Sequence, residues 1–246
     1  VMPPIKPMLA RATTTVPEAD GLLYEPKWDG YRCVVFRDGD EVELSSRGQK
    51  SLTRYFPELI DPIRAQLPRR CVVDCEVVVV TPDGLDFDLL GQRIHPAESR
   101  IERLSVETPA SLVVFDLLAL DEVDLRPMAF IERRGALVSL LADVIPPVHL
   151  SPVTDDPEVA QDWFRRFEGA GFDGVMAKRS DGVYEEDKRS LTKVKHRHSI
   201  DVVVAGYRPH KSGDGVGSMM LGLYDRPEGD RAASLQHVGV ASAFKA

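Results

Sequence analysis

Apolar residues along the chain gather in short runs that are rich in β-branched side chains. Such runs, bounded by turn residues, predict β-strands at residues 33–36, 72–80, 112–120, 174–177, 202–207 and 219–224. Helical spacing of apolar residues predicts helices at about residues 52–66, 128–142 and 157–168. Asp156 can cap the last of these, and Pro157 suits its first position. Because strands and helices do not alternate regularly, the pattern favours an α+β fold with mainly antiparallel sheets.

The pattern changes near residues 196–200. Before this point strands and helices are mixed, whereas only strands and turns rich in glycine and proline follow it. The sequence therefore predicts two domains, residues 1–199 and 200–246. Because only 46 residues follow Ile200, the second domain is expected to be an incomplete all-β barrel.

The predicted strand at residues 72–80 carries two acids among valines. Alternation places Asp74 and Glu76 on one face, and the opposite face is entirely apolar, with Cys71, Val73, Cys75, Val77 and Val79. A carboxylate in so apolar a strand costs free energy unless it is paired, hydrogen-bonded or bound to a metal or ligand. A salt-bridged core acid and a ligand-binding acid are both compatible with this pattern.

The segment from Glu25 to Arg32 reads Glu-Pro-Lys-Trp-Asp-Gly-Tyr-Arg. Proline and the Asp-Gly pair are expected to frame Lys27 in a turn between two β-like stretches. A lysine amine is almost entirely protonated at neutral pH, so a nucleophilic lysine must lose a proton with help from nearby cations or a metal. On this segment alone, a surface lysine in a turn is the simpler interpretation.

Three further predicted strands carry candidate ligand-binding residues. Phe115 lies inside an apolar strand, where it can be plain core or a stacking platform for a base. Met176 and Lys178 share one face of another strand. Lys193 and Lys195 share one face of a third, where two like charges are easier to explain if both meet phosphate.

Composition and charge narrow the class of protein. The 246 residues include 43% hydrophobic and 28% charged residues, which is typical of a globular protein. The net charge of −8, from 31 basic and 39 acidic residues, excludes a globally basic nucleic-acid-binding surface but allows a locally basic groove. Residues 178–211 form such a local excess, with 9 Lys or Arg against 5 Asp or Glu.

Other motifs and signals are missing from the sequence. No apolar run approaches the ~20 residues that a membrane helix needs, and the N-terminus lacks the apolar segment of a signal peptide. The three cysteines, Cys33, Cys71 and Cys75, form no CxxC pair, so neither a disulfide framework nor a zinc site is expected, and the compartment is predicted to be the reducing cytoplasm. No Walker motif occurs, which excludes P-loop kinases and ATPases.

Six short motifs, in order along the chain, resemble those of the covalent lysyl-nucleotidyltransferase superfamily, and within it the ATP-dependent DNA ligases. The family motifs KxDG, SRxG, a DGE type, FDLL, EGVMAK and KxK resemble residues 27–30, 46–48, 74–78, 115–118, 173–178 and 193–195. Residues 201–207 resemble the first strand of the attached OB domain. One KxDG is weak evidence, whereas six motifs in order are specific. The match is to small bacterial repair ligases of the LigC or LigD type.

The resemblance implies a nucleotidyltransferase adenylation domain, similar to the ATP-grasp arrangement, with antiparallel sheets flanked by helices and a partial OB fold after it. Lys27 would attack the α-phosphate of ATP and form a covalent lysyl-AMP. AMP would then pass to the 5′-phosphate at a DNA nick, and the 3′-hydroxyl would displace it and seal the strand. The residues implied to bind the nucleotide are Glu25, Pro26, Lys27, Arg32, Arg47, Glu76, Phe115, Met176, Lys193 and Lys195.

The resemblance also implies roles for individual residues. Lys193 and Lys195 would hold the α-phosphate and keep Lys27 neutral, while Arg32 and Arg47 would hold phosphate, later including the 5′-phosphate of a nick.

Base, ribose and metal contacts are implied in the same way. Phe115 would stack on adenine, Glu25 would accept a hydrogen bond from its amine, and Glu76 would touch the ribose. Asp173, together with Glu76, would place Mg²⁺ or Mn²⁺. The expected partners are nicked double-stranded DNA and a repair polymerase or end-joining proteins. The protein is expected to be a monomer without membrane contact. It is expected to act in repair, replication or recombination, in the cytoplasm at the nucleoid.

The sequence departs from the family pattern in three places. Asp173 stands where the family has Glu, and Gly48 comes one residue earlier than the glycine of SRxG. The family's final OB motif, which orients pyrophosphate, has no counterpart before Ala246. We therefore expect the 246-residue chain to hold AMP once loaded, but to adenylate slowly and seal nicks poorly.

Two alternatives remain open at this point. Within the superfamily, an RNA ligase or an RNA-capping guanylyltransferase uses the same lysine chemistry. Comparing the sealing of nicked RNA and nicked DNA tests for an RNA ligase, and comparing labelling by GTP and ATP tests for a capping enzyme. A catalytically silent nucleic-acid-binding module is the alternative from another class, and it would gain no AMP mass on incubation with ATP and Mg²⁺.

Overall fold

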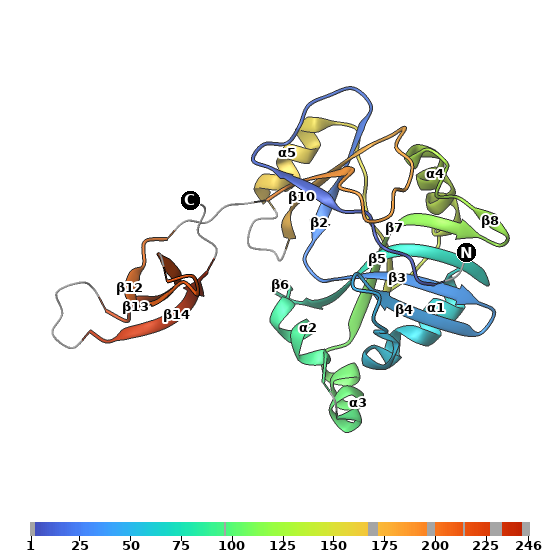
Figure 1. The fold of residues 1–246 in the computed structure, drawn as a ribbon. Helices are drawn as coiled ribbons and strands as arrows, with labels where there is room; N and C mark the ends of the chain where they lie inside the picture. The colour runs from blue at the N-terminus through green and yellow to red at the C-terminus, as the bar shows by residue number, and fades with distance from the viewer. Residues whose placement is uncertain are drawn as a thin grey trace. The chain divides into compact units, whose positions relative to one another are not determined.

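The computed structural model describes residues 3–95, 97–166, 172–195, 200–213, 215–226 and 233–242. The chain divides into two compact units, residues 1–196 and 197–246 (Figure 1). Sheets dominate both units, and helices occur in the larger one, so the α+β class predicted from the sequence is confirmed.

The larger sheet of the first unit forms where β-branched apolar residues are densest. Its strands run in the order β4-β3-β5-β7-β8, with β6 paired to β5 and β9 paired to β7. All of these pairs are antiparallel except β7 with β9. The bounds are β3 (Tyr31–Asp38), β4 (Glu41–Ser46), β5 (Arg70–Thr81), β6 (Gly84–Leu85), β7 (Ala110–Leu120), β8 (Val123–Asp124) and β9 (Val148–Leu150). The strands predicted at residues 33–36, 72–80 and 112–120 are confirmed.

A smaller sheet joins segments from the beginning and the end of this unit. Its order is β1-β11-β10-β2, and β1 runs parallel to β11. The bounds are β1 (Ala10–Thr13), β2 (Leu22–Trp28), β10 (Phe172–Arg179) and β11 (Leu191–Val194). The predicted strand at residues 174–177 is the centre of β10.

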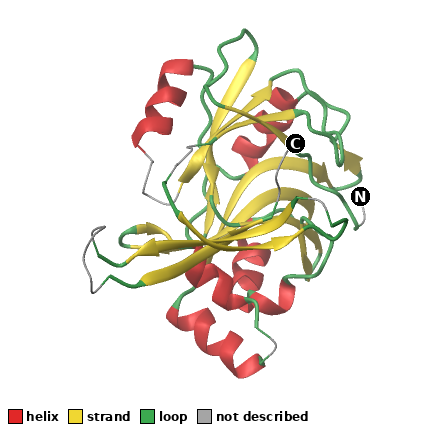
Figure 2. Cartoon of the chain, turned by 60° about the vertical axis from the view of Figure 1, so that its left-hand side comes forward, coloured by secondary structure: helices red, strands yellow, loops and turns green. Residues whose placement is uncertain are grey.

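Helices cover the outer faces of the two sheets (Figure 2). The helices are η1 (Thr53–Tyr55), η2 (Pro57–Leu59), α1 (Ile60–Gln66), α2 (Phe87–Arg93), α3 (Glu98–Glu107), α4 (Phe130–Leu140) and α5 (Pro157–Arg166), of which α3 packs mainly against η2. No described helix is both long enough and apolar enough to cross a membrane.

The helix predictions hold in two of three places. The helices predicted at residues 128–142 and 157–168 are α4 and α5, although residues 167–168 lie outside the described part of the chain. Asp156 caps α5, because its Oδ1 accepts from the backbone N–H of Glu158 at 2.8 Å. The single helix predicted at residues 52–66 is wrong in its first half, since the residue before Pro57 is driven out of the helical region, and two 3₁₀ turns replace it.

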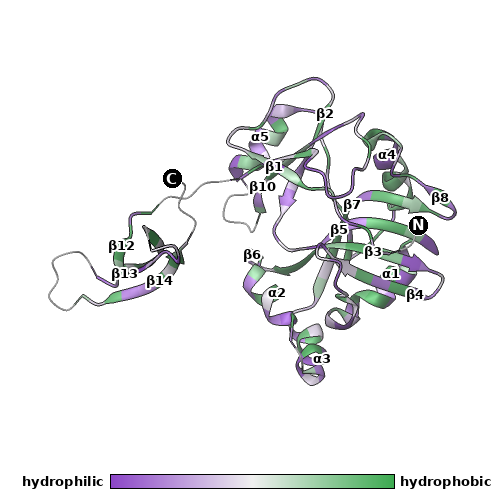
Figure 3. Ribbon diagram, viewed as in Figure 1, coloured by the Kyte–Doolittle hydropathy of each residue, from purple (hydrophilic) through white to green (hydrophobic). Residues whose placement is uncertain are grey.

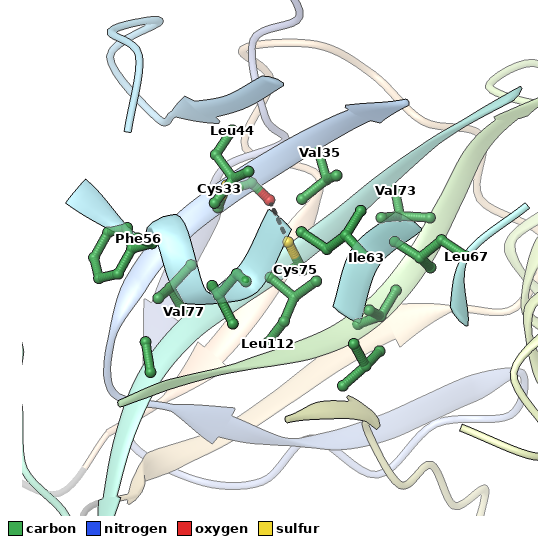
Figure 4. Close-up of a cluster of buried hydrophobic side chains, with 14 of the residues drawn as sticks. Cys33, Val35, Leu44, Phe56, Ile63, Leu67, Val73, Cys75, Val77 and Leu112 are labelled. Carbon is green, nitrogen blue, oxygen red and sulfur yellow. Dashed lines mark hydrogen bonds between the residues drawn. The ribbon is translucent and has the colours of Figure 1, made fainter. Parts of the chain in front are cut away.

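The main core lies between the larger sheet and its helices (Figure 4). The apolar face predicted for β5 is confirmed, because its alternate residues all enter this core: Cys71, Val73, Cys75, Val77 and Val79. They pack against side chains from the 3₁₀ turns and α1, including Phe56, Leu59, Ile63 and Leu67. Hydrophobic residues run along these strands (Figure 3). Each fully buried aliphatic side chain contributes about 1.5–3 kcal/mol, so this core anchors the sheet.

A second apolar cluster covers the opposite face of the same strands. It joins Val34, Phe36, Val72 and Leu118 to Ile5 and Met8 of the N-terminal segment and to Leu191 of the smaller sheet. The larger sheet is therefore buried on both faces, and one of these faces is turned towards the smaller sheet.

The second unit is a three-stranded antiparallel meander. Its strands are β12 (Val203–Pro209), β13 (Val216–Tyr224) and β14 (Leu235–Ala241), in that order. The strands predicted at residues 202–207 and 219–224 are confirmed. Residues 196–199, on which the predicted boundary falls, lie outside the described residues.

Candidate active site

A cavity of about 430 Å³ lies between the two sheets of the larger unit. Strands β2, β10 and β11 line it from the smaller sheet, and β3, β5 and β7 line it from the larger one. All eleven site residues predicted from the sequence line this cavity: Glu25, Pro26, Lys27, Arg32, Arg47, Glu76, Phe115, Asp173, Met176, Lys193 and Lys195. The structure thus gathers them in one place, while their individual roles stay predictions.

Lys27 lies near the end of strand β2, not in the turn that the sequence suggested. Pro26 is tolerated within that strand because β2 is the edge of its sheet, where a missing N–H breaks little pairing. The turn follows at Asp29 and Gly30 and leads into β3. The strand therefore fixes the backbone of Lys27, while its side chain keeps 19% of its surface exposed.

Gly30 brings this turn against the larger sheet. A Cβ atom at this position would lie 2.2 Å from the carbonyl oxygen of Val77 in β5, so only glycine fits. The close approach connects the end of β2, from one sheet, to β3 in the other. Gly30 thereby fixes the turn that closely follows Lys27.

Asp173 is the partner of two lysines. Its Oδ2 lies 2.6 Å from Nζ of Lys27 and also accepts from Nζ of Lys195. Burial acts to raise the pKa of Asp173, but the hydrogen bonds and charges of the two lysines outweigh it and lower the pKa below its ordinary value. The carboxylate therefore stays ionised and holds both amines at one point.

Gly174 makes this arrangement possible. It has a φ of +130°, and a Cβ atom there would lie 1.8 Å from the carbonyl oxygen of Val194. The close contact brings β10 and β11 together where Asp173 and Lys195 meet. Next to them, burial and the charges of Lys195 and Lys27 lower the pKa of Lys193.

Arg32 is held by a buried acid. Its Nε and Nη2 both lie 2.6 Å from the two carboxylate oxygens of Asp74, and the hydroxyl of Tyr184 donates to Asp74 Oδ2 at 2.6 Å. Asp74 is fully buried, so it is the salt-bridged core acid that the sequence pattern left open. The pair fixes the guanidinium of Arg32 at the cavity wall.

Phe115 reaches the cavity through an irregularity of β7. The pairing of β5 with β7 shifts register between Val114 and Asp116, so Phe115 is the extra residue of a β-bulge. Phe115 is 7% exposed, and Arg32 and Lys178 each place a positive group 4.8 Å from the centroid of its ring. These contacts are cation–π contacts with the same ring.

Glu76 lies on the cavity wall beside these residues. Burial raises its pKa to about 8, although the charges of Arg32 and Lys27 oppose the shift. The side chain is therefore largely protonated at neutral pH and can donate as well as accept a hydrogen bond.

Glu25 is buried in the same wall. Its Oε2 lies 2.6 Å from Nζ of Lys178, and its Oε1 lies 3.7 Å from Nη1 of Arg134 in α4. Glu25 thus has a basic neighbour at each of its two carboxylate oxygens.

Arg47 follows strand β4 in an exposed turn. Gln49 in this turn has a φ of +61°, a left-handed conformation that favours glycine. It occupies the place of the SRxG glycine, and Gly48 does not take up that conformation. The shifted glycine therefore leaves the turn with a non-glycine residue in its left-handed position.

Several contributors have no role in the sequence prediction. Tyr184 and Arg134 belong to the buried networks of the site, and Arg189 lines the cavity. The pair of arginines inside an otherwise apolar helical run was the available signal for Arg134, because a buried arginine needs partners.

Metal binding rests on few side chains. Among the described residues, no group of three or more His, Cys, Asp or Glu side chains is placed to hold a metal ion. Mg²⁺ is commonly held by one or two carboxylates together with substrate phosphates, so Asp173 and Glu76 suit it chemically. Glu76 must then lose its proton, and the two lysines compete for the Asp173 oxygens.

Comparisons with known proteins point in one direction. The family profile described as "ATP dependent DNA ligase domain" matches residues 7–195. DNA ligase C of Mycobacterium tuberculosis is 52% identical over 99% of this chain and 68% of that protein, and DNA ligase C1 of Mycolicibacterium smegmatis is 50% identical over all of this chain and 70% of that protein. A solved structure titled as mycobacterial DNA ligase D complexed with ATP and MES is 28% identical, with a TM-score of 0.63 over 97% of this chain and 72% of that chain.

Proposed function

Because the chain belongs to the ATP-dependent DNA ligase family, we propose that the cavity between its two sheets is where ATP modifies Lys27. The chain is an ATP-dependent DNA ligase, an enzyme that forms phosphodiester bonds. The observation that carries the assignment of the site is that all eleven predicted residues line one cavity, where Lys27 is paired with Asp173.

In the proposed first step, Nζ of Lys27 forms a bond to the α-phosphorus of ATP, and the bond to the bridging oxygen of pyrophosphate breaks. The amine must first give up one proton and leave its contact with Asp173. Lys193 and Lys195 neutralise the charge that develops on the phosphate, and positioning supplies the rest of the catalysis.

The second and third steps use DNA. The 5′-phosphate at a nick attacks the phosphorus of lysyl-AMP and releases Lys27, and the 3′-hydroxyl then displaces AMP and forms the new bond. Arg47, exposed at the rim, supplies charge for the 5′-phosphate, and Arg32 contacts the AMP phosphate after exchanging part of its pairing with Asp74.

Base and ribose contacts complete the proposal. Phe115 offers an aromatic surface for adenine, and Glu76, largely protonated, suits a hydrogen bond with ribose. Mg²⁺ or Mn²⁺ would be held by Asp173 and ATP phosphates, together with Glu76 after it loses its proton, and would supply charge neutralisation at those phosphates.

The setting of the enzyme is also proposed. Residues 200–246 serve as the first strands of an OB domain, and a monomer acts at nicks in double-stranded DNA, with a repair polymerase or end-joining proteins. The three cysteines are buried free thiols, which suits the reducing cytoplasm.

The first prediction tests the nucleophile. We expect Lys27→Ala to abolish covalent AMP on incubation with ATP and Mg²⁺, measured by intact mass, and to leave the melting temperature nearly unchanged. Lys27 is partly exposed, and Asp173 keeps Lys195 as a partner, so the loss to stability should be below about 1 kcal/mol.

The matched control is Lys6→Ala. Lys6 also forms an ion pair, with Asp187, but it is exposed and does not line the cavity. This variant should gain AMP as the unchanged chain does. Covalent AMP on the Lys27→Ala variant would show that another residue is the nucleophile.

A further inference from the structure

Unpartnered polar atoms gather behind one wall of the cavity. Five buried side-chain nitrogen or oxygen atoms of the described residues lack a hydrogen-bond partner, and three of them belong to one pair: Oε1 of Glu25, and Nε and Nη1 of Arg134. Buried polar atoms without a partner are rare in native proteins, and each needs an explanation. Their grouping at the cavity wall points to a ligand-related cause.

The two residues are held in place from their other ends. Oε2 of Glu25 accepts from Lys178 at 2.6 Å, and Nη2 of Arg134 donates to the backbone carbonyl of Ser151. Between these anchors, Nη1 of Arg134 stops 3.7 Å from Oε1 of Glu25. That distance allows charge attraction but is too long for a hydrogen bond, so Oε1 keeps its capacity to accept.

Only Glu25 of this pair faces the ligand. Glu25 lines the cavity, whereas Arg134 does not, and both side chains are less than 5% exposed. The arginine is therefore a neighbour of the acid without being a possible ligand contact itself.

The adjacent arginine in the same helix shows the contrast. Arg133 donates through Nε and Nη2 to both oxygens of Asp116, and through Nη1 to the carbonyls of Met128 and Gly182. It is as deeply buried as Arg134. Full pairing is thus available to an arginine in this helix, and the incomplete pairing of Arg134 is specific to its place behind Glu25.

We propose that Arg134 is a positioning residue that keeps Oε1 of Glu25 free and correctly aimed to accept a hydrogen bond from the exocyclic amine of the purine. It thereby sets the preference for a 6-amino purine over a purine that carries a 6-oxygen. This inference rests on the proposed function of the cavity and assigns a cause to its base preference.

Two basic neighbours hold the Glu25 carboxylate in one orientation. Lys178 attracts Oε2 of Glu25, and Arg134 attracts Oε1. The attraction to Arg134 opposes a rotation of the carboxylate that would bring both oxygens to Lys178. An amine facing Oε1 then completes a hydrogen bond to a charged acceptor, whereas a 6-oxygen places two acceptors against each other. Sites built around such a hydrogen bond reject ligands that lack the donor by large factors.

The experiment compares ATP with inosine triphosphate, which carries a 6-oxygen. Covalent nucleotide on the full chain is followed by intact mass over a range of concentrations, to give a maximum rate and a KM for each. We expect the unchanged chain to prefer ATP by about 10-fold to 100-fold in the ratio of rate to KM, the factor that a hydrogen bond to a charged group supplies. Arg134→Met should reduce this preference to about 3-fold or less, mainly by raising the KM for ATP.

Arg133→Lys is the matched control. It alters an equally buried arginine one residue away and should lower the melting temperature while leaving the ATP preference at the unchanged value. Should Arg134→Met not melt cooperatively, Arg134→Lys carries the comparison: its single amine cannot reach both the Ser151 carbonyl and Glu25, so a preference below the unchanged value is expected.

The outcomes separate the two levels of the proposal. An unchanged ATP preference in the folded Arg134 variant overturns the positioning role. If Glu25→Leu, which has no acceptor oxygen, still gains nucleotide and still prefers ATP, the base contact is overturned, while adenylation stands. A chain that gains no nucleotide from ATP at all contradicts the proposed function instead.

Discussion

At the scale of single residues, the site is governed by how its charges are shared. Asp173 holds two lysines at one oxygen, and Asp74 neutralises Arg32 from the core side. These pairs keep the cavity compatible with folding before a nucleotide enters, since unpaired buried charges are costly. Glu76 solves the same problem differently, by holding a proton.

The proton on Glu76 makes stability depend on pH. Its pKa is about 8 in the folded chain against an ordinary value of 4.5, so between these values the folded state holds a proton that the unfolded state has lost. Unfolding free energy should therefore fall as pH rises from 5 to 8, by at most about 1.4 kcal/mol per unit from this residue.

Glu76→Gln should flatten that slope. The amide resembles the protonated acid, so the variant should gain stability relative to the unchanged chain as pH rises, in nucleotide-free melting curves. Glu107→Gln, which alters an exposed acid at the end of α3, is the control and should keep the original slope. Parallel pH profiles for the Glu76 variant and the unchanged chain would refute the assignment.

The turn after β4 offers a second test at this scale. Gln49 has a φ of +61°, which costs an L-residue roughly 1 kcal/mol, whereas glycine adopts it freely. Gln49→Gly should raise the unfolding free energy by about 0.5 kcal/mol after the extra entropy of glycine in the unfolded chain is counted.

Gly48→Ala is the comparison for this turn. Gly48 has no left-handed φ, and its nearest neighbour to an added Cβ is 4.0 Å away, so alanine should be neutral or slightly stabilising. A destabilised Gln49→Gly in urea denaturation would mean that the glutamine side chain stabilises the turn.

At the scale of elements, prediction succeeded where the pattern is local. The valine-rich strand β5 and the side chains on each of its faces could be predicted, because the alternation of residues along a strand determines its faces. The short strands β1 and β4 and the helices α2 and α3 were missed, since α3 buries only Ile101 and Leu104 and has little apolar signal. The predicted first helix is broken by Pro57, which begins a 3₁₀ turn.

The candidate site was predictable for a different reason. Its residues could be named from motifs, but their pairing depends on contacts between sheets that no local pattern encodes. Arg32, which is expected to contact phosphate, is paired with Asp74 in this structure, and no local pattern predicts that partner. Lys27 was expected in a turn and lies in a strand. The bulge that admits Phe115 is set by the register between β5 and β7.

The glycine contact between the sheets can be tested directly. Gly30→Ala would place a Cβ atom 2.2 Å from a backbone oxygen of β5, which cannot move without breaking strand pairing. We expect a loss of about 1–3 kcal/mol in unfolding free energy, as for other overpacked sites, and loss of covalent AMP because Lys27 shifts.

Gly135→Ala provides the opposite expectation. Gly135 lies inside α4, and nothing lies within 4 Å of an added Cβ. Alanine there should stabilise the chain by about 0.5–1 kcal/mol and leave AMP formation intact. If both alanine variants behave alike in thermal melting, the close approach at Gly30 is not a constraint.

At the scale of the whole molecule, the cavity is lined mainly by basic residues although the chain as a whole is acidic. The chain carries a net charge of −8, whereas seven lysines or arginines and only four acids line the cavity. Lys178, Arg189, Lys193 and Lys195 come from the basic stretch that the sequence had marked. A concave site of one sign concentrates ligands of the other, even on an acidic protein.

This contrast predicts a salt effect on ATP. Raising NaCl from about 50 mM to about 500 mM shortens the screening length well below the size of the cavity, so the Kd for ATP should rise several-fold in calorimetry. Adenosine, which shares the base and ribose but has no charge, should bind with nearly the same Kd at both concentrations. If salt raised the Kd of both ligands equally, the salt effect would not arise from attraction between the cavity and the phosphates of ATP.

The order of strands in the smaller sheet has a consequence during synthesis. A ribosome delivers β1 and β2 near the start and β10 and β11 only near the end of this unit, so the early strands wait for their partners while the larger sheet is already complete through β9. Domains fold as units as they emerge. Lys27 thus leaves the exit tunnel long before Asp173, and the nucleotide pocket is the last feature of the unit to be assembled.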